Sequence, residues 1–392
     1  MTEERNRDSR IELLRIIAML LIIAHHLVTH SGVENLYEFG GAMPPAKMVF
    51  LQIFGMWGKT MVNVFVIITG WFMCTSSMTV RRFAKVYLEV KFFRLVIYFL
   101  LALAGAEVLS GGRIYAAVFS VLNSAGADFS SSFLVLYLLI PFLNTLMESL
   151  GRKRHTLLVC LLLCVYTVSS TFFFNYGAFS EIGWFVTLYL TAARLRFFVQ
   201  ESLDPERVGT EKRVNLFGIV SKIAFPASAV LSVLSILVMD RLPVDHAVYS
   251  PYYFISDSSK LLAFTNAVSL FLLFLGWYDR TPGEDVVKAG VKKEGGFQIN
   301  RIAACVFGVY LIHDNSDAVR DLLWHRIFRV AQWYDKPLPL LILLCVLSVF
   351  AVFAVCAVID YLRIRFLEPG ALALTDKAEA LIRRRTDRSV EQ

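Results

Sequence analysis

The sequence predicts an all-α integral membrane protein with about ten transmembrane helices and with both termini in the cytoplasm. Three observations lead to this class. The chain has 392 residues, of which 57% are hydrophobic and 18% are charged, and its mean hydropathy is +0.59. Its apolar residues form blocks close to the roughly 20 residues that a helix needs to cross a bilayer. Its basic residues gather in alternate connections between these blocks.

Ten membrane spans follow from the apolar blocks, in chain order. We expect them at residues 11–28, 48–74, 92–108, 132–149, 156–173, 182–199, 214–239, 261–278, 302–313 and 338–362. The second block is long enough to be broken near Gly55–Gly58, and the ninth is short for a full crossing. Residues 1–367 are expected to form one transmembrane domain, and the polar residues 368–392 a cytoplasmic tail.

The first block follows a charged start, as in a signal peptide. No small-x-small cleavage motif comes after it, and the block ends at His25 and His26. We therefore expect a retained first span.

The distribution of lysine and arginine determines the expected orientation. With the N-terminus inside, the cytoplasmic connections hold 28 of the 39 basic residues, and the opposite connections hold 9. Arg15 and Lys222 fall within spans. Cytoplasmic loops of membrane proteins carry such an excess, so the net charge of +7 does not indicate a nucleic acid partner.

The six cysteines lie in or beside apolar blocks, and no two of them form a CxxC pair. Neither a zinc site nor a disulfide framework is therefore indicated. We expect these side chains to pack as small hydrophobic groups.

The first span carries charged and titratable residues on one face. The eleven-residue step from Arg15 to His26 turns about 1100°, which is three full turns plus about 20°. Glu12 and His30 lie within about 60° of the same stripe. Arg15 could instead reach the cytoplasmic interface, and the histidines could be interfacial. Their alignment favours a stripe that faces the bundle interior, where intramembrane ionisable groups are functional.

A metal site is a second interpretation of His26 and His30, because histidines four residues apart on a helix can share a zinc ion. The sequence has no HExxH motif, and a third ligand would have to come from His246 or His313. We expect no metal.

Five segments carry a family resemblance, and they occur in order along most of the chain. They are "IELLRIIAMLLIIAHH" (11–26), "FVIITGWFM" (65–73), Arg82-x2-Lys85, "VLYLLIPFLN" (135–144) and "FGVYLIHDN" (307–315). The first resembles the signature of the acyltransferase-3 family of integral-membrane O-acyltransferases: an acid, two residues, Arg, ten residues, His. The last two are similar to segments of a Gram-positive branch.

Four positions depart from the family pattern. Glu12 replaces the more usual Asp, Thr69 replaces Ser, and Lys85 replaces Arg. The tryptophan expected before the fourth span is absent, and Asp128 stands near its place.

The resemblance implies an acyltransferase (transferring groups other than aminoacyl groups) that moves an acyl group, usually acetyl from acetyl-CoA, onto a hydroxyl of a cell-envelope polysaccharide or lipid-linked sugar. It implies His26 as general base, with Arg15 and Glu12 as further catalytic residues. The supporting residues would be His25, His30, His313 and Asp314, and the CoA phosphates would bind Arg81, Arg82 and Lys85. Acyl-CoA would be a substrate, with no permanently bound cofactor.

The same resemblance implies a multi-pass protein of the bacterial plasma membrane, whose partners are the lipid bilayer, acyl-CoA and a glycan acceptor. A transporter or flippase for glycan intermediates is the alternative, because ten spans and a polar stripe would also suit it. Transporters commonly contain inverted repeats with broken helices in matching places, and the sequence has no such correspondence.

Overall fold

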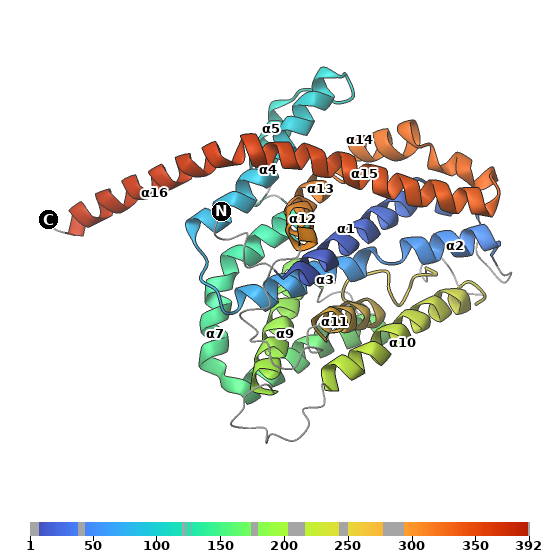
Figure 1. Cartoon of the computed structure of the whole chain (residues 1–392), viewed down its shortest axis with the longest axis horizontal. Helices are drawn as coiled ribbons and strands as arrows, with labels where there is room; N and C mark the ends of the chain where they lie inside the picture. Colours follow the sequence, from blue (N-terminus) through green and yellow to red (C-terminus); the bar gives the residue numbers. More distant parts are fainter. Residues whose placement is uncertain are drawn as a thin grey trace.

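The computed structural model has helices joined by turns, and no β-strand, over the residues that it describes. These are residues 8–37, 44–119, 121, 124–126, 128–173, 179–202, 216–242, 250–276 and 294–390. Helix α1 (Ser9–Thr29) lies in the middle of the bundle and packs against α2 (Ala46–Gly55), α3 (Gly58–Met73) and α11 (Leu261–Gly276) (Figure 1). The central position of α1 puts its polar stripe inside the protein.

The remaining elements surround this centre. Those longer than eight residues are α4 (Val80–Leu103), α7 (Phe129–Leu163), α9 (Glu181–Ser202), α10 (Leu216–Met239), α12 (Glu294–Ala303), α15 (Leu338–Phe366) and α16 (Glu368–Val390). The other helical segments have eight residues or fewer and are η2 (Val33–Leu36), α5 (Gly111–Val118), η3 (Cys164–Val168), α8 (Ser169–Phe172), α13 (Val306–His313), α14 (Asp317–Arg320), η4 (Asp321–Ile327) and η5 (Val330–Asp335).

Six helical stretches of the described chain are long and apolar enough to cross a membrane. They are Ser9–Thr29, Ala46–Met73, Phe129–Phe172, Glu181–Val199, Ser221–Met239 and Leu338–Phe366. The chain is thus a helical, multi-pass membrane protein. Ten crossings and cytoplasmic termini stay predictions.

The stretch Phe129–Phe172 folds back on itself at Gly151, whose φ of 65° is a left-handed conformation that glycine adopts readily,. Before the bend, the Ser132 hydroxyl donates to Glu181 at 2.8 Å. After it, the Tyr166 ring lies 6.0 Å from the Trp184 ring. Both arms therefore reach the same end of α9, in agreement with separate spans predicted at 132–149 and 156–173.

The second predicted span is broken where expected, between α2 and α3. A Cβ atom on Gly55 would lie 2.9 Å from the Cβ of Val28, and one on Gly58 would overlap the His25 ring. Glycines at these two positions therefore let the broken helix approach α1 closely.

The third predicted span, 92–108, is wrong in its limits. Helix α4 starts twelve residues earlier, at Val80, where the Thr79 hydroxyl accepts the Arg82 N–H, and it ends at Leu103. Charged residues along α4 have distant partners, including Arg363 for Glu89 and Asp128 for Arg94. Because these charges are paired, they can lie within the helix.

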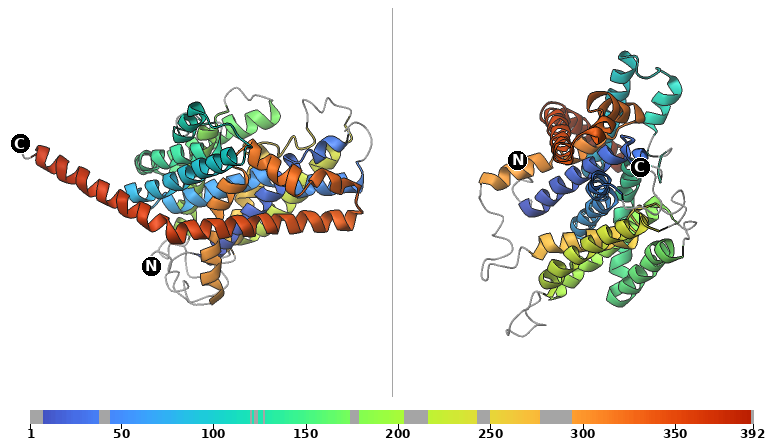
Figure 2. Two further views of the ribbon diagram at one scale, coloured as in Figure 1. Left: turned by 90° about the horizontal axis from the view of Figure 1, so that it is seen from above. Right: turned by 90° about the vertical axis from the view of Figure 1, so that its right-hand side faces the viewer.

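The predicted tail 368–392 is mostly the helix α16, which passes α4 and then leaves the body of the molecule (Figures 1 and 2). Two of its carboxylates meet basic residues of α4. Asp376 pairs with Arg81, and Glu368 lies 2.7 Å from Lys85 Nζ.

Candidate active site

A cavity of about 940 Å³ runs along one face of α1. Arg15, Met19, Ile22, His26 and His30 all line it. From Arg15 to His30 the helix rises by about 22 Å at 1.5 Å per residue. The shared face predicted for Arg15 and His26 is thus confirmed, and the cavity has an Arg15 end and a His30 end.

A chain of hydrogen bonds determines which nitrogen of His26 carries a proton. His313 Nδ1 lies 2.7 Å from the Val309 carbonyl oxygen, which can only accept, so this nitrogen carries the proton,. The other ring nitrogen of His313, Nε2, then accepts from His26 Nδ1 at 3.0 Å. His26 Nε2 is left with its lone pair, which is what a general base needs. His313 is the last residue of α13, which packs against α1, and its side chain is fully buried there.

Asp314 supplies the negative charge beside these histidines. Its Oδ1 atom lies 3.7 Å from His26 Nδ1 and 3.7 Å from His30 Nε2. Arg320 Nε donates to the same oxygen at 2.6 Å and so holds the carboxylate in place. Burial and Arg320 lower the pKa of His30, although Asp314 opposes them. His30 is therefore neutral at neutral pH.

The side-chain ligand atoms of His26, His30 and Asp314 lie within 4.8 Å of one another, a spacing that could admit a metal ion. The guanidinium of Arg320, already on the Asp314 carboxylate, would repel a divalent cation there. The arrangement favours a proton-transfer site over a metal site. His246, the other third ligand considered, lies outside the described residues.

His25 faces the break between α2 and α3. Its Nδ1 donates to the Gly55 carbonyl oxygen at 2.6 Å, and its ring packs on Gly58. Like His26, it lines the cavity.

Replacing Gly58 with alanine is expected to destabilise the protein by about 1–3 kcal/mol, because the new methyl group would overlap the His25 ring and shift it,. Thermal unfolding of the purified protein checks this. Gly111→Ala is the matched control, since its Cβ would meet no atom within 4 Å. Equal loss of stability in both variants would contradict the close contact.

At the Arg15 end, only some of the residues predicted to bind the donor line the cavity. Arg15 Nη1 lies 3.3 Å from the buried carboxylate of Glu12, and Lys85 lines the cavity there. Arg81 and Arg82 are not among the lining residues. Arg81 pairs with Asp376, and Arg82 Nη1 donates to the Ser77 carbonyl at 2.8 Å.

The cavity also brings in charged residues that the sequence analysis did not single out: Lys59, Glu89, Arg94, Glu107, Arg113, Glu181, Asp317 and Arg320. Asp128 was noted only as a departure from the family pattern. It is the N-cap of α7 and accepts from Ser130 N and Ser131 N. Burial raises the pKa of its carboxyl, but Arg94 and the serine hydroxyls outweigh that effect and hold the pKa below its usual range. The run "DFSSS" is the one sequence signal for this cap,.

Comparison with known families places these residues in context. The model of one family, described as an acyltransferase domain, matches residues 8–360. The chain belongs to the acyltransferase-3 family. No curated protein and no solved structure matches it. Membership of this family indicates acyl transfer in a membrane, and the matched range includes every residue of the cavity named above. The likeness to a Gram-positive branch stays a prediction.

Proposed function

We propose that this acyltransferase-3 protein transfers an acyl group, in the first instance acetyl, from acyl-CoA to a hydroxyl of a cell-envelope polysaccharide or lipid-linked sugar in a bacterial plasma membrane. One observation carries the proposal. The hydrogen bonds from His26 through His313 to Val309 leave His26 Nε2 unprotonated, in a cavity that runs along α1. A sugar hydroxyl is a poor nucleophile at neutral pH and needs such a base.

The reaction consists of one proton transfer and one acyl transfer. His26 Nε2 takes the proton of the acceptor hydroxyl as its oxygen attacks the thioester carbonyl. The tetrahedral intermediate collapses, the C–S bond breaks, and the thiolate of CoA leaves and takes up the proton from His26. The products are the sugar ester and free CoA. Asp314, 3.7 Å from His26 Nδ1, stabilises the imidazolium while it exists.

The donor is assigned to the Arg15 end. The Arg15 guanidinium, oriented by Glu12, can donate to a phosphate oxygen of CoA, and the pantetheine arm extends along the cavity to bring the thioester to His26. Lys85 lines the same end, and Arg81 and Arg82 lie on the adjoining start of α4. If the N-terminus is cytoplasmic, the donor enters from the cytoplasm and the acceptor from outside.

The proposal is tested by mass spectrometry of envelope polysaccharide from cells with and without this chain. A mass increase that depends on the chain, and that alkali removes, identifies both the ester and the acyl group, so acetyl and succinyl are distinguished. Polysaccharide of unchanged mass would contradict acyl transfer. A change in the amount of glycan, without an ester, would instead indicate the transporter.

Replacing His313 with leucine is expected to lower the rate of transfer between about tenfold and about 10⁴-fold, because His26 loses the acceptor that sets its tautomer,. The KM for acyl-CoA should stay within about twofold, since His313 is fully buried and does not line the cavity. Initial rates over a pH series check this. An unchanged rate with an unchanged pH profile would contradict the positioning role.

A further inference from the structure

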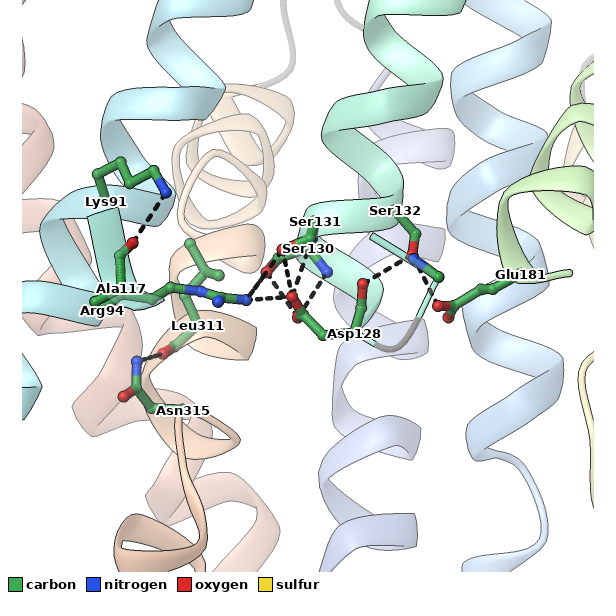
Figure 3. A network of polar contacts seen from close by, with 11 residues as sticks. Lys91, Arg94, Ala117, Asp128, Ser130, Ser131, Ser132, Glu181, Leu311 and Asn315 are labelled. Atoms are coloured by element: carbon green, nitrogen blue, oxygen red, sulfur yellow. Dashed lines mark hydrogen bonds and ion pairs between the residues drawn. The ribbon is translucent and has the colours of Figure 1, made fainter. Parts of the chain in front are cut away.

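A polar network forms the part of the cavity wall where α4, α7 and α9 meet. Figure 3 shows Arg94 of α4 reaching Asp128, with Ser130, Ser131 and Ser132 at the start of α7 and Glu181 at the start of α9. Arg94, Asp128 and Glu181 line the same cavity as His26. The general base has no hydrogen bond to any of them, so the acid–base chemistry does not account for this network.

The network is held in place by many contacts. The Asp128 carboxylate accepts from two backbone N–H groups and two serine hydroxyls of α7. Arg94 uses one nitrogen, Nη2, to bind Asp128 and the Ser130 hydroxyl. Within the described part of the chain, its Nη1 and Nε atoms make no hydrogen bond. The guanidinium is already held in place by Asp128 and Ser130, so its remaining N–H donors can bind a ligand with little further loss of side-chain entropy.

Glu181 adds an acceptor to the same wall. Its Oε2 atom accepts from the Ser132 hydroxyl at 2.8 Å, whereas Oε1 has no partner among the described residues. The side chain is partly exposed to the cavity. The wall therefore offers free donors on Arg94 and a free acceptor on Glu181, and a hydroxyl group can use both because it donates and accepts.

The charges of this region indicate a neutral ligand. Each arginine at the His30 end is already paired with a carboxylate: Arg94 with Asp128, Arg113 with Glu107, and Arg320 with Asp314. Lys59 also lines the cavity, within electrostatic reach of the Glu181 carboxyl group. Positive and negative side chains are therefore matched here, and the excess of positive charge that a phosphate or carboxylate ligand prefers is absent.

Aromatic rings connect the network to the histidines. Phe129 lines the cavity beside Asp128, and its ring centroid lies 5.2 Å from that of Tyr310. The Tyr310 ring is in turn 6.2 Å from that of His313, the partner of His26. Phe129, Phe133 and Tyr310 thus give the wall an apolar surface between the network and the base. A sugar ring has hydroxyls at its edge and C–H groups on its faces, and so fits a wall of this composition.

We propose that Arg94, Asp128 and Glu181 form an acceptor subsite that binds the hydroxyls of an uncharged sugar and presents one of them to His26. The presentation to His26 rests on the proposed acyl transfer, whereas sugar binding does not. Asp128 acts as the positioning residue for Arg94. Arg94 and Glu181 touch the ligand and determine which sugar is accepted.

The test uses the full chain, purified and placed in lipid nanodiscs. The probes are the neutral disaccharides cellobiose, maltose and N,N′-diacetylchitobiose, with digalacturonate as the anionic comparison and acetyl-CoA as the donor. We expect at least one neutral disaccharide to bind, with digalacturonate weaker. Arg94→Lys and Glu181→Gln should each weaken sugar binding about tenfold, as expected for one charged hydrogen-bond partner. Acetyl-CoA should bind both variants as it binds the wild type, which shows that they fold.

The matched control is Arg154→Lys, an exposed residue outside the cavity, which should bind the disaccharide like the wild type. Binding of none of the neutral disaccharides, stronger binding of digalacturonate, or unchanged sugar affinity in both variants would each overturn the subsite. The two proposals fail separately. If sugar binding depends on Arg94 and Glu181 but no ester forms, acyl transfer is wrong. If esters form with the same acceptor KM in both variants, the subsite is wrong.

Discussion

Replacing His26 with alanine is expected to lower acyl transfer by at least about 10²-fold, because general base catalysis contributes about 10²–10⁴ to the rate. The acceptor hydroxyl would then lose the base that takes its proton, which is the His26 imidazole in the tautomer set by His313. Neighbouring His30 cannot replace it without moving, since its ring centroid is 5.0 Å from that of His26. The measurement is transfer of radiolabelled acetyl from acetyl-CoA to glycan in membranes that contain equal amounts of each variant.

His325→Ala is the matched control, because this histidine is exposed and does not line the cavity. It should transfer acetyl at the wild-type rate. Binding of acetyl-CoA to the His26 variant should also persist, since the donor is assigned to the Arg15 end, about 16 Å away along α1 at 1.5 Å per residue. A His26→Ala protein that transfers acetyl within a few-fold of the wild type would contradict the role of this histidine.

Local patterns along the sequence predicted the parts of the fold and site that depend on them. The spacing of Arg15 and His26 needs only the geometry of a helix, and both side chains line one cavity. The break between α2 and α3 was signalled by Gly55 and Gly58, and the turn between the two arms of the α7 stretch by the polar residues at Gly151.

Contacts between residues far apart in the chain could not be predicted in this way. His26 and His313 are separated by 287 residues, yet they share the hydrogen bond on which the mechanism depends. The limits predicted for the third span were wrong for the same reason. A charged stretch was assigned to a loop, because the partners that neutralise it come from other helices: Arg363 for Glu89 and Glu368 for Lys85.

Arg363 forms the most heavily paired of these long-range charge clusters. Its side chain is 6% exposed, and its three nitrogens each meet a carboxylate: Nε with Asp360 at 2.6 Å, Nη2 with Glu89 at 3.0 Å and Nη1 with Glu368 at 3.1 Å. The cluster joins α4, α15 and α16. Gly308 of α13 packs against the Asp360 carboxyl group, so closely that a Cβ atom at this position would overlap it.

Replacing Arg363 with leucine is expected to destabilise the protein by about 3–5 kcal/mol, because three carboxylates would remain close together without their shared cation. Arg363→Lys keeps the charge but can reach fewer carboxylates at once, so its loss should be intermediate. Arg365→Leu, two residues further on and exposed, removes the same charge and should change stability by no more than about 0.5 kcal/mol. Thermal unfolding of the three purified variants in one detergent ranks them. If Arg363→Leu unfolds at the same temperature as Arg365→Leu, the cluster does not hold α4, α15 and α16 together.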